Sequence, residues 1–269
     1  MVVQTKSGQL EGCLENSWFV FKNIPYAEAP VGPLRFKPPV PVKPWEGVRD
    51  ATVYGPCAMQ TPDTNDIKGF DISEDCLTLN IWTPEHFEGR KLPVVFYIHG
   101  GGYVAGSSRQ PGFNGPNFAR DNNIVFVAPQ YRLGAFGYLF LGDRLGEEYQ
   151  SSGTCGTLDQ ALALQWVHDN IAAFGGDPDN ITVFGQSGGG GKVSTLLQTP
   201  AADGLFQKGI IMSGLFKGIF TPPEKIKEQH RKLVLKILNE LQIPEDQAEK
   251  LESVPYDVLE RAYNKAQYK

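Results

Sequence analysis

The stretch Ile181–Gly191 reads ITVFGQSGGGG and predicts a strand and a sharp turn that lead into a helix. Four strand-forming residues lead into Gly185-Gln186-Ser187-Gly188-Gly189, which fits the pattern G-x-S-x-G, and Lys192–Gln198 has helical character. A serine on such a strained turn holds its hydroxyl at the top of a sheet, and small neighbours let the chain turn that tightly. The stretch therefore predicts that Ser187 is a nucleophile that attacks a carbonyl carbon.

A second stretch, Pro93–Ile98, decides between two interpretations of this serine. On its own, G-x-S-x-G is equally explained as a glycine-rich turn that closes a strand, because the chain contains 30 glycines. The run PVVFYI is typical of a buried strand, and it ends in His99-Gly100-Gly101-Gly102-Tyr103. This is an HGGG-type loop, which supplies backbone N–H groups to an oxyanion hole. Two half-sites, the serine turn Gly185–Gly189 and the loop His99–Tyr103, thus lie at the ends of two predicted strands.

The composition is that of an ordinary globular chain. Its 269 residues are 41% hydrophobic and 20% charged, which suits one large α/β domain. The net charge of −5 and the scattered basic residues argue against a nucleic-acid partner. No apolar run approaches the roughly 20 residues that a membrane span needs, and no targeting segment is visible. We expect a cytoplasmic protein, or a secreted one that has lost its signal peptide.

The order of the predicted elements indicates the fold class. Strands and helices alternate from about residue 94 onward, which implies a doubly wound, mostly parallel sheet with its ligand site at the carboxyl ends of the strands. The expected elements are an N-terminal hairpin in Met1–Phe21, a proline-rich ordered coil over Asn23–Gly55, a polar loop over Gln60–Asp71, strands at Leu77–Trp82, Ile124–Ala128 and Gly209–Ser213, and a helix over Leu158–Phe174 that ends at Gly175-Gly176.

Several motifs together resemble the type-B carboxylesterases, the group that includes cholinesterases, bile-salt lipases and bacterial para-nitrobenzyl esterases. Phe174–Gly189 is similar to the serine signature of that family, and Glu74–Asn80 (EDCLTLN) to its second signature. Flanking segments agree as well: GPLRFKPP at Gly32–Pro39, PWEGVRDA at Pro44–Ala51 and YRLGAFGYL at Tyr131–Leu139. The resemblance extends from Gly8 to Gly214 and implies the α/β-hydrolase fold.

The resemblance assigns roles to particular residues. Ser187 would be the nucleophile, and the backbone N–H groups of Gly101, Gly102 and Gly188 would form the oxyanion hole. Ser213 matches a buried serine that supports the catalytic acid and histidine in relatives. Cys57 and Cys76 match the N-terminal disulfide of the family, which would close the loop Gln60–Asp71 in an oxidising compartment.

Two residues beside the serine depart from the pattern of the family. Relatives usually have Glu before the serine and Ala after it, where this chain has Gln186 and Gly188. Gly188 keeps its N–H group. Gln186 removes a carboxylate from the pocket, so we expect no preference for choline-like esters.

The remaining members of a catalytic triad are not recognisable. The triad of this fold runs in the order Ser, acid, His, and only His230 follows Ser187. His230 lies in an amphipathic helix, and His86, His99 and His168 are no better candidates for the general base. We therefore expect residues 1–269 to be the N-terminal portion of one α/β-hydrolase domain, with residues 222–269 starting a helical cap. The missing C-terminal half would be its partner and would supply the acid and the histidine.

These observations predict a serine carboxylic-ester hydrolase that acts on small or medium esters through an acyl-serine intermediate. No cofactor and no metal are expected, because acyl transfer needs only charge stabilisation and a proton shuttle, and no cysteine pair has C-x-x-C spacing. Two alternatives stay open: a non-catalytic binding or adhesion relative, or an inactive fragment of the esterase fold. A lipase or thioesterase with a different acyl pocket is a third.

Overall fold

The computed structural model describes residues 1–61, 67–109, 119, 122–214 and 222–267. The strands are β1 (Val2–Gln4), β2 (Gln9–Glu11), β3 (Cys13–Glu15), β4 (Trp18–Pro25), β5 (Val48–Asp50), β6 (Thr78–Pro84), β7 (Leu92–Ile98), β8 (Val125–Pro129), β9 (Gly176–Gln186) and β10 (Lys208–Met212). The helices are α2 (Gly134–Tyr138), α3 (Gly142–Leu145), α4 (Cys155–Asn170), α5 (Gly188–Leu196), α6 (Pro223–Glu240) and α7 (Tyr256–Gln267), and Glu245–Ser253 is a 3₁₀ segment. None of these described helices is long and apolar enough to cross a membrane.

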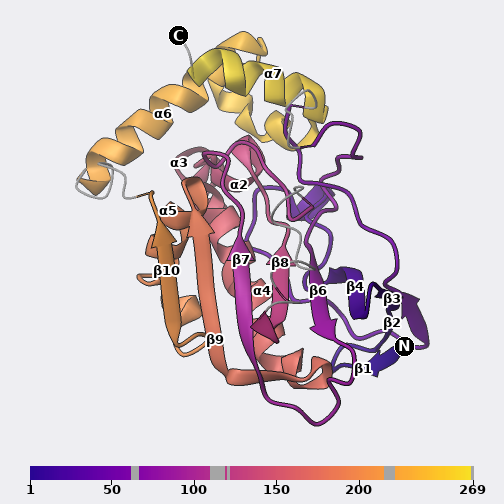
Figure 1. Cartoon of the computed structure of the whole chain (residues 1–269). Coiled ribbons are helices and arrows are strands. Elements are labelled where there is room, and N and C mark those ends of the chain that lie inside the picture. Colours follow the sequence, from indigo (N-terminus) through magenta and orange to yellow (C-terminus); the bar gives the residue numbers. More distant parts are fainter. Residues whose placement is uncertain (62–66, 110–118, 120–121, 215–221, 268–269) are drawn as a thin grey trace.

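The centre of the molecule is a seven-stranded mixed sheet in the order β10-β9-β7-β8-β6-β4-β3 (Figure 1). The neighbours β10, β9, β7 and β8 run parallel, whereas β6, β4 and β3 pair antiparallel. The parallel part follows the predicted alternation of strands and helices. The antiparallel part is larger than the single hairpin that we predicted, because β6 reverses direction between β8 and β4 as well.

The N-terminal hairpin is in fact two hairpins. Strands β1 and β2 pair with each other, and β5 adds to β2 in a separate three-stranded sheet. Strands β3 and β4 form the second hairpin, at the edge of the large sheet as predicted. The polar loop predicted over Gln60–Asp71 contains residues 62–66, which lie outside the described residues.

Helices α4 and α5 cover one face of the sheet, and the main hydrophobic core lies between them and the strands. Alternate residues of each central strand point into this core, as the period of two in a strand dictates. They include Val94 and Phe96 of β7 and Ile181 and Val183 of β9. Helix α4 contributes Ala161, Leu164 and Val167 to the same core. On the other face an aromatic cluster covers the middle strands: Trp18, Trp82, Tyr97 and Phe126. Strand β8 is buried at every position, as we predicted for a central strand.

Strand β10 is the exception to this burial. All five of its residues are exposed, and Ile210, Ile211 and Met212 keep 51%, 38% and 49% of their surface in contact with solvent. Among the described residues β10 pairs only with β9, so it is an edge strand with apolar side chains. An uncovered apolar edge is an unusual feature for a stable isolated sheet.

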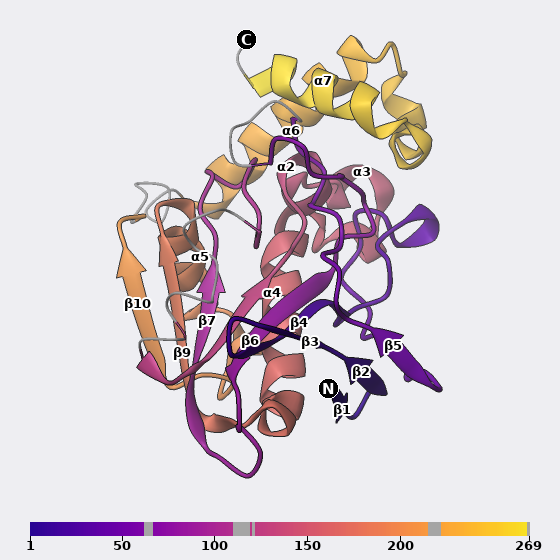
Figure 2. The ribbon, with the colours of Figure 1, turned by 45° about the vertical axis from the view of Figure 1, so that its right-hand side comes forward.

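The C-terminal helices form a layer of their own above the ends toward which β9 and β10 run (Figures 1 and 2). Helices α6 and α7 contact each other, and α7 packs on α2. Their apolar faces form a second core with α2, in which Phe136, Ile237, Leu251 and Leu259 are buried. The amphipathic segments predicted after residue 222 therefore fold back over the carboxyl ends of the parallel strands.

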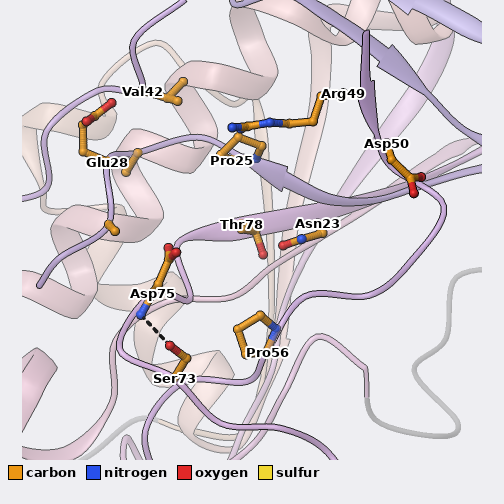
Figure 3. A pocket seen from close by; sticks show the side chains of 12 residues that line it. Asn23, Pro25, Glu28, Val42, Arg49, Asp50, Pro56, Ser73, Asp75 and Thr78 are labelled. Atoms are coloured by element: carbon orange, nitrogen blue, oxygen red, sulfur yellow. Dashed lines mark hydrogen bonds between the residues drawn. The ribbon is translucent and has the colours of Figure 1, made fainter. Parts of the chain in front are cut away.

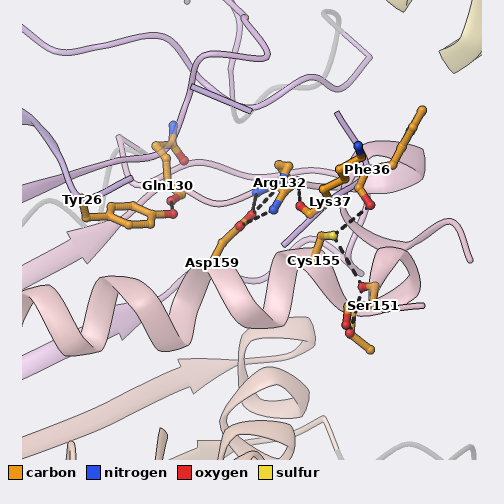
Figure 4. Close-up of polar contacts among 9 residues, drawn as sticks. Tyr26, Phe36, Lys37, Gln130, Arg132, Ser151, Cys155 and Asp159 are labelled. Carbon is orange, nitrogen blue, oxygen red and sulfur yellow. Dashed lines mark hydrogen bonds and ion pairs between the residues drawn. The ribbon is translucent and has the colours of Figure 1, made fainter. Parts of the chain in front are cut away.

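A buried ion pair holds three separate segments together below this layer (Figure 4). Arg132 follows β8, Asp159 lies on α4, and their side chains are 3% and 0% exposed. The Arg132 guanidinium donates to both Asp159 oxygens, from Nε at 2.9 Å and from Nη2 at 2.7 Å. Its Nη1 also donates to the Lys37 carbonyl in the proline-rich coil at 2.7 Å. Every charged atom of the pair is thus satisfied without water, which a buried ion pair requires.

Candidate active site

Ser187 lies on the tight turn between β9 and α5. Its backbone has φ 55° and ψ −123°, a strained conformation that a residue other than glycine rarely adopts. The Ser187 N–H donates to Met212 O at the end of β10 at 2.8 Å, and the Gly191 N–H donates to Ser187 O at 3.1 Å. Ser187 is exposed. The strand, turn and helix predicted from G-x-S-x-G are therefore present.

The glycines that follow Ser187 let α5 start against the ends of two strands. A Cβ added to Gly189 would lie 2.2 Å from Ile98 O, and one added to Gly190 would lie 2.1 Å from Ser213 O. Both distances are shorter than real contacts, and both neighbours are backbone atoms that cannot rotate away. The helix therefore begins at Gly188, four residues earlier than the helical character of Lys192–Gln198 suggested, because close approach to the sheet outweighs the poor helix propensity of glycine.

The HGGG loop turns back on itself directly after β7. Gly101, Gly102 and Tyr103 have φ values of 92°, 61° and 68°. The N–H groups of Val104 and Ala105 donate to Gly101 O at 3.1 and 3.0 Å and close the turn. The N–H groups of Gly101 and Gly102 take no part in these bonds, and no hydrogen bond from either is recorded to another described residue.

The two half-sites meet beside Ser187. A Cβ added to Gly188 would lie 2.8 Å from Gly102 N, and one added to Gly100 would lie 3.7 Å from Ser187 Cβ. The start of α5 and the HGGG loop are therefore in direct contact. This places backbone donors from two separate segments next to one serine, which is the arrangement that an oxyanion hole needs.

Gln186 and Ser213, the two residues that the sequence suggests as possible support for the nucleophile, flank this turn. Gln186 is the exposed last residue of β9. Ser213 follows β10 with φ 65°, and it is exposed here, unlike the buried serine that it matches in the resemblance. Its exposure follows from that of β10, because no described segment covers this edge.

None of the four histidines hydrogen-bonds to Ser187 in the described part of the chain. His86 precedes β7 and His168 lies near the end of α4, so both are at the opposite end of the sheet from Ser187. His230 is half-buried on α6, where burial lowers its pKa. His99 is fully buried, its Nδ1 lies 3.0 Å from Gly100 O, and burial and the nearby Lys192 lower its pKa to about 3. His99 is thus a neutral structural residue, as predicted.

Cys57 and Cys76 are both buried and both are free thiols, so the disulfide that the resemblance implies is not formed in this structure. The Cys57 Sγ and the Ser107 hydroxyl are 3.1 Å apart and share a hydrogen bond. Burial raises the pKa of both thiols. Protonated thiols in such surroundings are unreactive.

A cavity of about 480 Å³ lies apart from these residues, at the start of β6 (Figure 3). It is lined by Glu28, Arg49, Asp50, Asp75 and Thr78, among others, and by none of the predicted site residues. Within the described ranges no group of three or more His, Cys, Asp or Glu side chains is placed to hold a metal ion.

Comparisons with known proteins identify the family of the chain. A model of the carboxylesterase family matches residues 1–269. The chain belongs to the carboxylesterase family. It is 42% identical over 264 residues to the para-nitrobenzyl esterase of Bacillus subtilis (strain 168), covering 97% of this chain and 52% of that protein. It is 44% identical over 223 residues to the phenmedipham hydrolase of Pseudarthrobacter oxydans, covering 80% of this chain and 43% of that protein.

Solved carboxylesterase structures have the same fold. A carboxylesterase from Geobacillus stearothermophilus superposes with a TM-score of 0.89 at 44% identity, over 98% of this chain and 53% of that one. An esterase from Clostridium hathewayi gives a TM-score of 0.88 at 44% identity, over 100% of this chain and 54% of that one. These matches confirm the predicted α/β-hydrolase fold. The carboxylesterase chain described here spans about half the length of these relatives.

Sequence reasoning missed one residue of the site, Lys192. It lies four residues after Gly188 and therefore on the same side of α5. Its Nζ contacts the ring of Tyr103 in the HGGG loop. Its side chain is only 1% exposed. The signal in the sequence was a single charged residue in an otherwise uncharged helix, five residues after the nucleophile.

Proposed function

We propose that this carboxylesterase chain carries the nucleophile and the oxyanion hole of a serine carboxylic-ester hydrolase. The observation that supports it best is the contact between Gly188 and Gly102 beside the exposed Ser187. Nucleophilic acyl transfer requires a hydroxyl and backbone donors within one site, and both are here. The names of the relatives, all of them esterases or hydrolases, point to the same chemistry.

The reaction then proceeds in two steps. A histidine outside these 269 residues takes the proton of Ser187, and the serine oxygen attacks the ester carbonyl carbon. The N–H groups of Gly101, Gly102 and Gly188 stabilise the oxyanion of the tetrahedral intermediate, and the protonated histidine releases the alcohol. Water, activated by the same histidine, cleaves the acyl-serine and releases the acid.

We propose neutral esters of small or medium size as the substrates. Gln186 stands beside the nucleophile where a carboxylate would attract a cationic alcohol, so no charge selects choline-like esters. The Clostridium hathewayi esterase is described as able to hydrolyse aliphatic aromatic polyesters, and such a substrate is likewise uncharged.

The C-terminal half of a longer chain is the partner that would complete the site. Among the described strands β10 has one edge without a partner, and it exposes the side chains of Ile210, Ile211 and Met212. Further strands added to this edge would bury these residues and continue the sheet. Relatives about twice as long as this chain have the additional length that such strands require.

Labelling with a fluorophosphonate probe tests the proposal. Intact mass of the purified protein before and after labelling, with tryptic mapping of the adduct, is expected to show one adduct on Ser187 in a species that contains further chain. A species of 269 residues that stays unlabelled would identify an inactive fragment. A longer species that stays unlabelled would favour a non-catalytic relative.

The steric demand at Gly101 gives a mutational test of the oxyanion hole. A Cβ at Gly101 would lie 2.0 Å from Ala105 O, and its φ of 92° disfavours alanine. We expect Gly101→Ala to displace the loop and slow turnover of a para-nitrophenyl ester by about 10²- to 10³-fold, the effect of losing one oxyanion donor.

Gly102→Ala is the matched control for this substitution. A Cβ at Gly102 meets no atom within 4 Å, although its φ of 61° still imposes a backbone cost of about 1–2 kcal/mol. We expect a clearly smaller loss of activity. Equal losses in the two variants would mean that backbone strain, and not displacement of the loop, decides the rate.

A further inference from the structure

Lys192 is a buried amine that the mechanism above does not use. Its side chain is 1% exposed, and its Nζ is buried without a hydrogen-bond partner among the described residues. An ammonium group in such a place loses its hydration without an anion to replace it. Burial accordingly lowers the pKa of Lys192 from 10.5 to about 7. A buried, unpaired charge of this kind is costly, and such groups are found where function requires them.

Two aromatic rings take the place of water around the amine. The Nζ lies 4.4 Å from the centre of the Tyr103 ring and 5.2 Å from the centre of the Tyr131 ring. An ammonium group is attracted to the face of such a ring, and more strongly when it is desolvated. The neutral amine lacks this attraction. The contact is therefore made mainly by the protonated form.

Tyr103 connects this contact to the oxyanion hole. It follows directly after Gly101 and Gly102, and its φ of 68° is a conformation that a tyrosine adopts only when its surroundings hold it. Its carbonyl accepts a hydrogen bond from Gly134 N at 2.8 Å. The ring of Tyr103 contacts the amine of Lys192.

The other titratable groups around Lys192 are neutral or already paired. His99 stacks on Tyr131, with ring centres 4.4 Å apart, and its low pKa keeps it uncharged. Burial raises the pKa of Tyr103, Tyr131 and Tyr138, so all three stay protonated. On α4, which packs against α5, the carboxylate of Asp159 is paired with Arg132. Lys192 is thus the group of this cluster that changes its charge near neutral pH.

We propose that Lys192 is a positioning residue for the oxyanion hole: its ammonium group, held against the faces of Tyr103 and Tyr131, keeps the HGGG loop in register with Gly188 on the same helix. The inference rests on the proposed ester hydrolysis. One side chain then connects the two segments that supply the backbone donors, and the order of the loop depends on the protonation of the amine.

The pH dependence of Ser187 labelling tests this proposal. The rate constant for reaction with a fluorophosphonate is measured between pH 5.5 and 9 in the protein as it occurs, with any further chain that it carries. Wild type should show a decline as the pH rises through about 7, where Lys192 loses its proton, superimposed on the rise due to the catalytic histidine. Lys192→Met, of similar size and uncharged, should lose this decline and react about tenfold more slowly at pH 6.5.

Lys192→Arg is the conservative control, because a guanidinium keeps its charge and also packs on aromatic faces. It should retain most of the rate and show no decline at pH 7 to 9. Equal rates and identical pH profiles in wild type and Lys192→Met would overturn the proposal and leave Lys192 as a packing residue.

A second readout does not depend on catalysis. Hydrogen–deuterium exchange of the peptide that contains Gly100–Ala105, corrected for the intrinsic rate, should be faster in Lys192→Met than in wild type at pH 6.5. If neither protein reacts with the probe, the proposed esterase function fails while this exchange still decides the role of Lys192. Unchanged exchange would contradict it.

Stability separates this role from a purely structural one. The folded-state pKa of Lys192 lies below its ordinary value, so burial of the amine costs stability below about pH 7, and the cost fades as the pH approaches 10.5. Lys192→Met should therefore raise the denaturation midpoint at pH 6 to 7 while it slows labelling. A residue that serves only the fold would show a lower midpoint.

Discussion

Substitution of Ser187 by alanine should abolish reaction with a fluorophosphonate and lower ester turnover by about 10⁴- to 10⁶-fold. The reason is that the Ser187 hydroxyl forms the covalent intermediate, and alanine has no nucleophilic group to replace it. The folded structure should persist, because the strain of the turn resides in the backbone, and Ser187 uses only its backbone N–H and carbonyl for the hydrogen bonds that the structure records. The loss is measured as kcat for a para-nitrophenyl ester.

Ser194→Ala is the matched control on the same helix. Ser194 is buried, and its hydroxyl donates to Gly190 O at 3.2 Å, so its loss removes one local hydrogen bond. Labelling of the Ser194→Ala variant should remain within a few-fold of wild type. Persistent labelling of Ser187→Ala at a wild-type rate would show that another residue is the nucleophile.

Removal of one charge from the buried Arg132–Asp159 pair should lower the free energy of unfolding more than any other substitution proposed here. In Asp159→Asn the shape of the side chain is kept, but the Arg132 guanidinium, 3% exposed, is left without its counter-charge. A buried charge stripped of its partner costs about 3–5 kcal/mol, a large part of the stability of a typical domain. We expect a loss of this size in urea-induced unfolding, together with weaker attachment of the coil that Arg132 holds through Lys37 O.

The same helix provides the control for this substitution. Asp169, also on α4, pairs with Lys6 at 2.7 Å, but the two side chains are 35% and 69% exposed. Exposed pairs contribute about 0–1 kcal/mol, so Asp169→Asn should change the free energy of unfolding little. If Asp159→Asn proved as mild as Asp169→Asn, the Arg132–Asp159 pair would not be the connection between segments that its geometry indicates.

Much of the fold could be predicted because its signals are local. The apolar runs at Pro93–Ile98 and Ile124–Ala128 became β7 and β8. The helix predicted over Leu158–Phe174 became α4, which ends at Asn170, and a 3₁₀ segment, Ile171–Phe174, that ends at Gly175 with φ 77°. Such runs and end signals depend on neighbouring residues only. The division of the first 21 residues into two hairpins in different sheets depends on strand partners far along the chain, such as β5 and β6, and no local pattern carries that information.

The start of α5 shows a conflict between local and tertiary effects. Four consecutive glycines are poor helix formers, and the sequence indicated helical character only from Lys192 onward. Glycine is needed at Gly189 and Gly190 because Ile98 O and Ser213 O lie where a Cβ would be, and the segment is nevertheless helical. Close packing of the turn against two strands therefore decides the secondary structure at Gly188–Gly191, and the same packing brings Gly188 to Gly102.

The sequence alone indicated the family of this chain, because Phe174–Gly189 and Glu74–Asn80 are contiguous stretches whose residues can be compared with the family signatures without knowledge of the fold. The tertiary structure alone decided three other features. It buried Lys192 against Tyr103 and Tyr131, it left Cys57 and Cys76 as free thiols, and it exposed all of β10. Each of these features depends on which segments pack together across the sheet. Packing decides which groups are buried, and burial shifts the pKa of an amine such as Lys192.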